Sequence, residues 1–187
     1  MAERPDNRAI EPAQLRRELE QIHLDCFGWA VACCCGDRDQ AEEVLQSSYL
    51  KAMAGRATFN GHSGIRTWFF GVVKRTAAEQ RRSRFVRSAA LARWARALPS
   101  RRSTPTPEAM SDRAEVCNRL AGLLAELSPR QRDLLHLVFY QEMTIEQAAE
   151  VLGISVGTAR THYERGKARL RAQLQGAGEQ INVASRA

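Results

Sequence analysis

Apolar residues recur at intervals of three and four along nearly the whole chain, and no stretch alternates apolar and polar residues at period two. Such spacing places apolar side chains on one face of a helix, whereas a half-buried strand requires alternation. The sequence therefore predicts an all-α protein. Helices are expected over residues 12–35, from 39 to about 54, from 65 into an Arg-rich end with a weaker continuation to about 98, and again from 112 onward.

Breaks in this pattern divide the chain into two parts. Gly36-Asp37 ends the first predicted helix, and residues 55–64 are expected to form a loop. Residues 98–111, LPSRRSTPTPEAMS, carry three prolines and no apolar periodicity, a composition typical of a linker. We therefore predict two small helical domains, residues 1–97 and 112–187, joined by a flexible basic linker at 98–111.

The charge balance favours a polyanionic partner. Lysine and arginine number 28 against 21 aspartates and glutamates, which gives a formal net charge of +7. A basic surface is a weak signal by itself, and a basic protein without such a partner is the alternative. No apolar run approaches the ~20 residues that cross a bilayer, and the first twenty residues are too polar for a secretory signal. A cytoplasmic protein is expected.

The cysteines and histidines give little sign of a metal or catalytic centre. Five cysteines, three of them adjacent at 33–35, form a poor disulfide framework, so free thiols are expected. His23, Cys26 and Cys33 share one helical face, but ten residues of helix rise ~15 Å, too far for one metal with bonds of ~2 Å. We expect Cys26 and Cys33 to be small apolar core residues. No metal, cofactor, catalytic residue or small-molecule substrate is predicted, and hence no enzyme.

Residues 143–174, MTIEQAAEVLGISVGTARTHYERGKARLRAQL, predict two helices joined by a tight turn. Thr144 can cap the first helix, and Gln147 three residues later completes a capping box. Gly153 suits the turn, because glycine adopts a left-handed conformation at little steric cost. Ser155 can then cap the second helix. This order of cap, glycine turn and second cap is typical of a helix-turn-helix that binds DNA.

The second helix of this pair has one apolar seam and one polar face. Its seam is spaced three and four residues apart and consists of Val156, Ala159, Tyr163, Gly166 and Leu170. The remaining surface carries residue types that read base edges or bind phosphates. The residues expected to contact DNA are Thr158, Arg160, Thr161, Glu164, Arg165, Lys167 and Arg169. A surface helix with a solvated basic face is the alternative.

Four segments match the pattern of a known family. LSPRQRDLLHLVFYQEMTIEQAAEVLG and ISVGTARTHYERGKARLRAQL lie in the second half of the chain, and DQAEEVLQSSYLKAMAG and FNGHSGIRTWFFGVVKRTAAEQRRSR lie in the first. The first two resemble region 4 of bacterial RNA polymerase sigma factors of the small extracytoplasmic-function (ECF) type. The other two resemble region 2 of the same family. The resemblance covers about residues 20–175.

The resemblance implies a promoter-specificity subunit of RNA polymerase. In that family region 2 binds the clamp helices of the β′ subunit and captures the minus-10 element, and region 4 reads the minus-35 element and meets the β flap. The implied polymerase contacts are Asp39, Glu42, Glu43 and Gln46. The implied minus-10 contacts are Phe59, Asn60, His62, Trp68, Lys74, Arg75, Arg81 and Arg82. These residues supply the stacking and positive groups that an unstacked base and its phosphates require.

Some positions depart from the family pattern. Arg75 stands where the family often has an asparagine linked to reading the minus-10 element, and Ser47 and Ser48 replace the usual acidic residue and its neighbour. Trp68 also fits the core rather than a base stack. The minus-10 and polymerase contacts therefore follow the family only in part.

The resemblance also implies control by an anti-sigma factor, commonly membrane-bound, in a stress or environmental response. Free of polymerase, the chain is expected to be closed around that inhibitor. Three other interpretations stay open. They are a dimeric helix-turn-helix repressor or activator with a palindromic site, a nucleic-acid-modifying enzyme that uses histidine and cysteine, and a helical interaction protein without a DNA role. A conventional repressor would leave the first domain unexplained.

Overall fold

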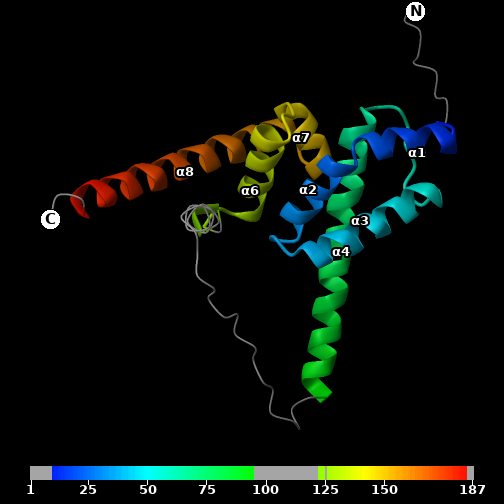
Figure 1. Cartoon of the computed structure of the whole chain (residues 1–187), viewed down its shortest axis with the longest axis horizontal. Coiled ribbons are helices and arrows are strands. Elements are labelled where there is room, and N and C mark those ends of the chain that lie inside the picture. Colours follow the sequence, from blue (N-terminus) through cyan, green and yellow to red (C-terminus); the bar gives the residue numbers. More distant parts are fainter. Residues whose placement is uncertain (1–9, 95–121, 125, 185–187) are drawn as a thin grey trace, which may run out of the picture.

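The computed structural model describes residues 10–94, 122–124 and 126–184, with the helical backbone alone for 87–94 and 176–184. The elements are α1 (Pro12–Gln21), α2 (His23–Cys33), α3 (Arg38–Met53), α4 (Ile65–Trp94), α6 (Pro129–Leu135), the π-helical turn η2 (His136–Tyr140), α7 (Ile145–Leu152) and α8 (Val156–Ala184) (Figure 1). The described residues contain no strand. The predicted all-α fold is confirmed. The predicted linker, residues 98–111, lies outside the described residues.

The helix predicted over residues 12–35 is in fact two helices, so that prediction is wrong. α1 ends at Gln21 and α2 begins at His23, because Ile22 between them adopts φ −100° and ψ 13°. The apolar spacing runs through this bend without interruption, so periodicity could not reveal it. Leu19 of α1 and Cys26 of α2 are both fully buried. α1 packs against α2 and α4.

α2, α3 and α4 form an N-terminal unit around three large aromatic side chains. Trp29, Phe69 and Phe70 are completely buried, and the indole Nε1 of Trp29 donates a hydrogen bond of 3.0 Å to the backbone oxygen of Phe70. This bond satisfies the one polar atom of the indole ring, which would otherwise be buried without a partner. The loop predicted at residues 55–64 lies between α3 and α4, and it turns at Gly61 with φ 72°.

α6, η2, α7 and α8 form a C-terminal unit. Ser128 and Gln131 exchange side-chain and backbone hydrogen bonds in a capping box at the start of α6. α6 then packs against α8 at Gly166, where a Cβ atom would lie 3.2 Å from Gln131 Cβ and 3.3 Å from Leu135 Cδ1. Because real Cβ atoms are rarely so close to a neighbour, glycine at position 166 lets the two helices approach.

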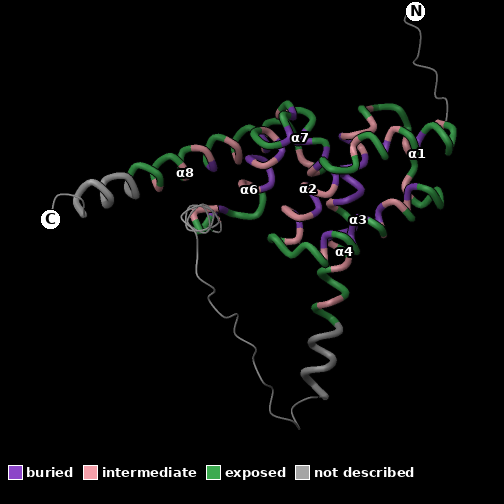
Figure 2. Tube along the Cα trace, in the orientation of Figure 1, coloured by how far each residue is buried: buried purple, intermediate pink, exposed green. Residues whose placement is uncertain are grey.

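The two units share one hydrophobic core. Val72 and Val73 of α4 belong to the same buried cluster as Ala148, Ala149 and Val151 of α7. α7 packs along α4, and η2 contacts α2. Figure 2 shows the buried residues gathered where α2, α4 and α7 meet, while α8 leads away from this centre with a largely exposed surface.

The prediction of two helical domains joined by a linker did not say how the two units pack against one another. Hydrophobic periodicity identifies which face of a helix is apolar, but it does not say which partner covers that face. The proposed boundaries at residues 97 and 112 lie outside the described residues and stay a prediction.

Candidate nucleic-acid and polymerase interface

The helix-turn-helix is built as its sequence predicts. Thr144 Oγ1 accepts from the Gln147 N–H at 3.2 Å, and Gln147 Oε1 accepts from the Thr144 N–H at 2.9 Å. Gly153 ends α7 in the left-handed region at φ 63°. Ser155 Oγ accepts from the Thr158 N–H at 3.2 Å and thereby caps α8. These bonds fix the path from α7 into α8.

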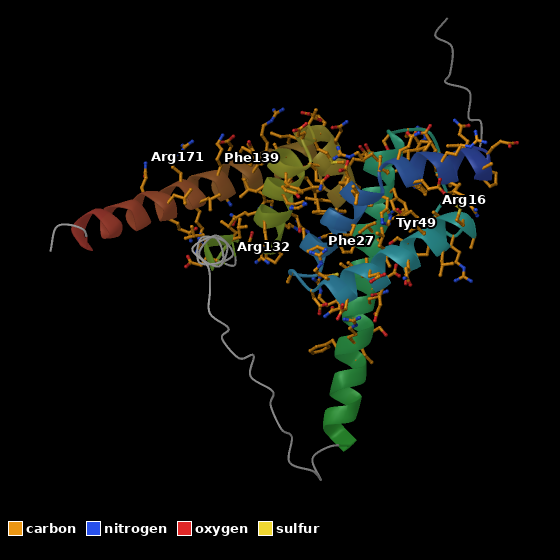
Figure 3. All side chains as sticks on the ribbon, viewed as in Figure 1. Arg16, Phe27, Tyr49, Arg132, Phe139 and Arg171 are labelled. Atoms are coloured by element: carbon orange, nitrogen blue, oxygen red, sulfur yellow. The ribbon has the colours of Figure 1, made fainter. Side chains whose placement is uncertain are left out.

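α8 presents the predicted polar face to solvent. On the seam, Ala159 and Gly166 are buried against the unit, while Val156 is 37% exposed. Away from the seam, five residues of the predicted DNA-contacting set are exposed: Arg160, Thr161, Glu164, Arg165 and Arg169. The other two, Thr158 and Lys167, are half-buried. Farther along the helix, Arg171 lies on the part of α8 that extends away from the rest of the molecule (Figure 3). A long accessible surface is therefore available to a large partner.

The charged residues of this face form loose ion pairs. Arg160 Nη2 lies 3.3 Å from Glu146 Oε1, and Lys167 Nζ lies 3.1 Å from Glu164 Oε1. The pKa of Glu146 lies below its ordinary value, first because its carboxylate accepts from its own backbone N–H at the start of α7, and further because Thr144 and Arg160 are close. Exposed pairs of this kind contribute at most about 1 kcal/mol. Phosphate groups can therefore replace them.

The predicted minus-10 residues of the loop before α4 lie together. The rings of Phe59 and Trp68 meet edge to face with centroids 5.4 Å apart. Asn60 Oδ1 accepts from the His62 N–H at 3.3 Å, and both side chains are exposed. Trp68 is half-buried and packs against the hydrophobic core. Its ring therefore contacts the core as well as Phe59 of the loop.

The predicted basic residues of α4 separate into two groups. Arg75, Arg81 and Arg82 are exposed. Lys74 instead points toward the C-terminal unit, where its Nζ donates to Asp133 Oδ2 at 2.5 Å. Its ammonium also lies 5.5 Å from the centre of the Trp29 ring. The structure therefore does not bring Lys74 onto the exposed basic surface of α4.

The predicted polymerase contacts lie on one exposed stripe of α3. Asp39, Glu42, Glu43 and Gln46 are all exposed, and Glu43 Oε2 pairs with Arg84 Nη2 at 2.6 Å. Two apolar residues continue this stripe, and sequence reasoning missed them: Leu50, 69% exposed, and Met53, 37% exposed. Their spacing from Gln46, four and seven residues, is the signal that could have found them. The stripe is acidic at one end and apolar at the other.

Two of the cysteines, Cys26 and Cys33, behave as core residues, whereas Cys34 is half-buried and Cys35 is exposed. Cys26 and Cys33 are buried, and burial raises the pKa of the Cys26 thiol to about 12 and raises that of Cys33 as well. Both thiols stay protonated, whereas metal binding and nucleophilic attack require the thiolate. Within the described residues, no three His, Cys, Asp or Glu side chains are placed to hold a metal ion. The same residues include no helix with the length and apolarity to span a bilayer.

Comparison with known proteins identifies the class. Residues 117–170 match the family described as sigma-70, region 4, a span that contains α6, η2, α7 and the first half of α8. The helix-turn-helix and its exposed polar face therefore lie in a segment that is similar to region 4 of sigma-70 factors.

Relatives extend the likeness to most of the chain. It is 27% identical over 149 residues to the RNA polymerase sigma factor YlaC of Bacillus subtilis (strain 168), covering 78% of this chain and 83% of that protein. It is 27% identical over 171 residues to the ECF RNA polymerase sigma factor SigL of Mycobacterium tuberculosis (strain ATCC 25618 / H37Rv), covering 91% and 94%. The resemblance to ECF sigma factors is confirmed, and it reaches beyond region 4 into the N-terminal unit.

A solved structure has the same fold. The sigma factor RpoE from Bartonella quintana, in complex with the anti-sigma factor NepR, superposes with a TM-score of 0.64 at 23% identity, covering 86% of this chain and 96% of that one. The likeness includes both helical units.

Proposed function

We propose that this chain is an alternative sigma factor, which binds core RNA polymerase and directs initiation at specific promoters in a stress or environmental response. The observation that carries the proposal is the capped helix-turn-helix of a sigma-70 region 4, whose exposed face holds Thr161, Glu164 and Arg165. The chain then acts by binding and positioning, and polymerase supplies the bond chemistry.

Each surface receives one role in this proposal. The exposed face of α8 reads the minus-35 element, with Arg165 and Glu164 suited to guanine and cytosine edges. The loop before α4 captures the minus-10 element, because the Phe59 and Trp68 rings offer stacking and Asn60 and His62 offer hydrogen bonds. The exposed stripe of α3 meets the β′ clamp helices, and the C-terminal unit meets the β flap.

The proposal includes an inhibitor. RpoE, which has the same fold, was solved with an anti-sigma factor. We infer that an anti-sigma factor, anchored in the inner membrane, masks the α3 stripe of this chain until a signal releases it to the cytoplasm and nucleoid. Co-purification with a membrane fraction that is lost on substituting Leu50 tests this part.

Run-off transcription tests the main proposal. Purified core polymerase is given a fragmented genomic library with and without the chain, and the chain is expected to produce discrete transcripts that share upstream elements. The Arg165→Ala variant should lose those transcripts while still binding core polymerase. No transcripts and no association with core polymerase would refute the proposal, and a palindromic binding site would favour a dimeric repressor instead.

A further inference from the structure

Three adjacent cysteines at the carboxyl end of α2 have no part in the proposed contacts with DNA or polymerase. Cys33, Cys34 and Cys35 all line one cavity of about 160 Å³, whose other walls come from α3 and α4. Cys33 is buried, Cys34 is half-buried and Cys35 is exposed, so the cavity can be reached from solvent. A water molecule occupies about 30 Å³ in the liquid, so a small molecule fits beside the thiols.

The backbone of this turn suits glycine better than cysteine. Cys35 adopts φ 56°, and Gly36 follows at φ 92°. The Gly36 N–H donates to the backbone oxygen of Val31 at 2.9 Å, which closes the end of α2. A residue with a Cβ atom is strained in the left-handed region, and strain of this kind is commonly retained at functional sites. Cysteine at position 35 is therefore costly to the fold, which favours a role for its thiol.

An unsatisfied acceptor lines the same cavity. The side-chain Nε2 of Gln80, on α4, donates to Ser47 Oγ at 3.1 Å and to the backbone oxygen of Glu43 at 3.4 Å. Its Oε1 is buried and has no hydrogen-bond partner among the residues that the structure describes. Because a buried oxygen without a donor costs free energy, a ligand that brings an O–H group is stabilised here.

The charges beside the cavity are mainly positive. Arg81 of α4 lines it, and Arg132 of α6 places Nη1 3.9 Å from Cys35 Sγ. The carboxylate of Asp37 already accepts hydrogen bonds from the backbone and side chain of Gln40 in the cap of α3. The two guanidinium groups repel a metal cation, whereas they do not repel an uncharged ligand.

The state of the thiols also favours an uncharged ligand. Burial raises the pKa of Cys33 and of Cys34, and the charge of Asp37 raises the pKa of Cys34 further. A metal cation must displace the protons of the thiols that it binds. An uncharged hydroxide of a thiophilic element instead condenses with protonated thiols and releases water, so this obstacle does not apply to it.

We propose that this cavity binds trivalent arsenic, as arsenous acid, As(OH)₃, through the thiols of Cys34 and Cys35. Two As–O bonds break and two As–S bonds form. Each thiol proton leaves with a hydroxide as water, and arsenic stays trivalent throughout. The remaining As–OH group donates to Gln80 Oε1. Adjacent thiols favour this product, because the second As–S bond forms within one molecule.

Titration of the full-length chain with arsenite tests the site directly. A phosphine keeps the thiols reduced, since a small dithiol would compete for arsenic. Native mass spectrometry should show one arsenic per chain, and X-ray absorption at the arsenic edge should show a first shell of two sulfurs and one oxygen. A different first shell, or tighter binding of Zn²⁺ than of arsenite, would overturn the proposal. The assay contains no polymerase, so its result does not depend on the proposed function.

The Cys35→Gly variant separates loss of the site from loss of the fold. It removes the thiol and relieves the strain at φ 56°, so the urea midpoint of unfolding should not fall. Its affinity for arsenite should fall by about a hundredfold, because only one As–S bond remains. Cys26→Ala is the control. It removes a buried thiol that does not line the cavity, so it should leave the affinity unchanged.

The Gln80→Met variant tests the acceptor. Methionine keeps a side chain of similar length but cannot accept from the As–OH group, so the affinity should fall about fivefold while the two As–S bonds remain. Full affinity in Cys35→Gly, or an equal loss in Cys26→Ala, would overturn the arsenic site. An unchanged affinity in Gln80→Met would remove Gln80 from it and overturn the proposed binding geometry.

Discussion

His136 couples the stability of this fold to pH. It begins η2, and its ring lies 5.4 Å from the Trp29 ring of α2 and 5.0 Å from that of Tyr140. Burial among these groups lowers its pKa from 6.5 to about 4. At the same interface Lys74 of α4 and Asp133 of α6 pair with one another, and His136 Nε2 lies 3.4 Å from the side-chain amide of Gln141. The ring is thus held neutral where the two units meet.

The sign and size of the effect follow from linkage. Because the folded chain binds the proton more weakly than the unfolded chain, the contribution of His136 is complete above pH 6.5 and is lost as the pH falls toward 4. Lowering the pH from 7.5 to 5.5 therefore shifts the folding equilibrium about tenfold toward the unfolded chain. This shift lowers the free energy of unfolding by about 1.4 kcal/mol.

Urea unfolding at these two pH values measures this quantity. Other groups also titrate, so the result is taken as the difference between the wild type and His136→Phe, which keeps an aromatic ring against Trp29 but cannot be protonated. The wild type should lose about 1.4 kcal/mol more than the variant on acidification. His62→Gln, a change at an exposed loop histidine, should behave as the wild type. An equal loss in wild type and His136→Phe would refute the reasoning.

Three further substitutions test other parts of the structure. Arg165→Ala should weaken binding to a cognate minus-35 duplex by about 1–3 kcal/mol in a titration, with a much smaller effect on random DNA; equal losses would make its role purely electrostatic. Leu50→Asp should weaken binding to core polymerase in a pull-down, whereas Leu24→Asp, at an exposed leucine of α2, should not; equal binding by both would remove the apolar end of the α3 stripe from the interface. Gly153→Ala should lower the free energy of unfolding by about 1–2 kcal/mol, because φ 63° strains any residue with a Cβ; unchanged stability would contradict that strain.

The features that sequence predicted well are local. Thr144, Gly153 and Ser155 each form the cap or turn that their types and spacing indicate. A cap depends on bonds to residues two or three positions away, so the sequence contains all the participants. The exposed recognition face of α8 follows from the same local logic, because the 3.6-residue period that buries Ala159 and Gly166 turns Arg165 outward.

The features that sequence did not predict depend on distant residues. The family resemblance implies that Lys74 contacts DNA, yet its partner in the structure is Asp133, fifty-nine positions later. Arg66 and Gln141 are seventy-five positions apart. The sequence around neither residue indicates that the two form a hydrogen bond. The bend at Ile22 belongs to the same group, since it lets two helices pack on a surface made by a third. Such pairs form only because two helix faces pack against one another. The tertiary structure determines which faces pack, and local sequence patterns do not contain that information.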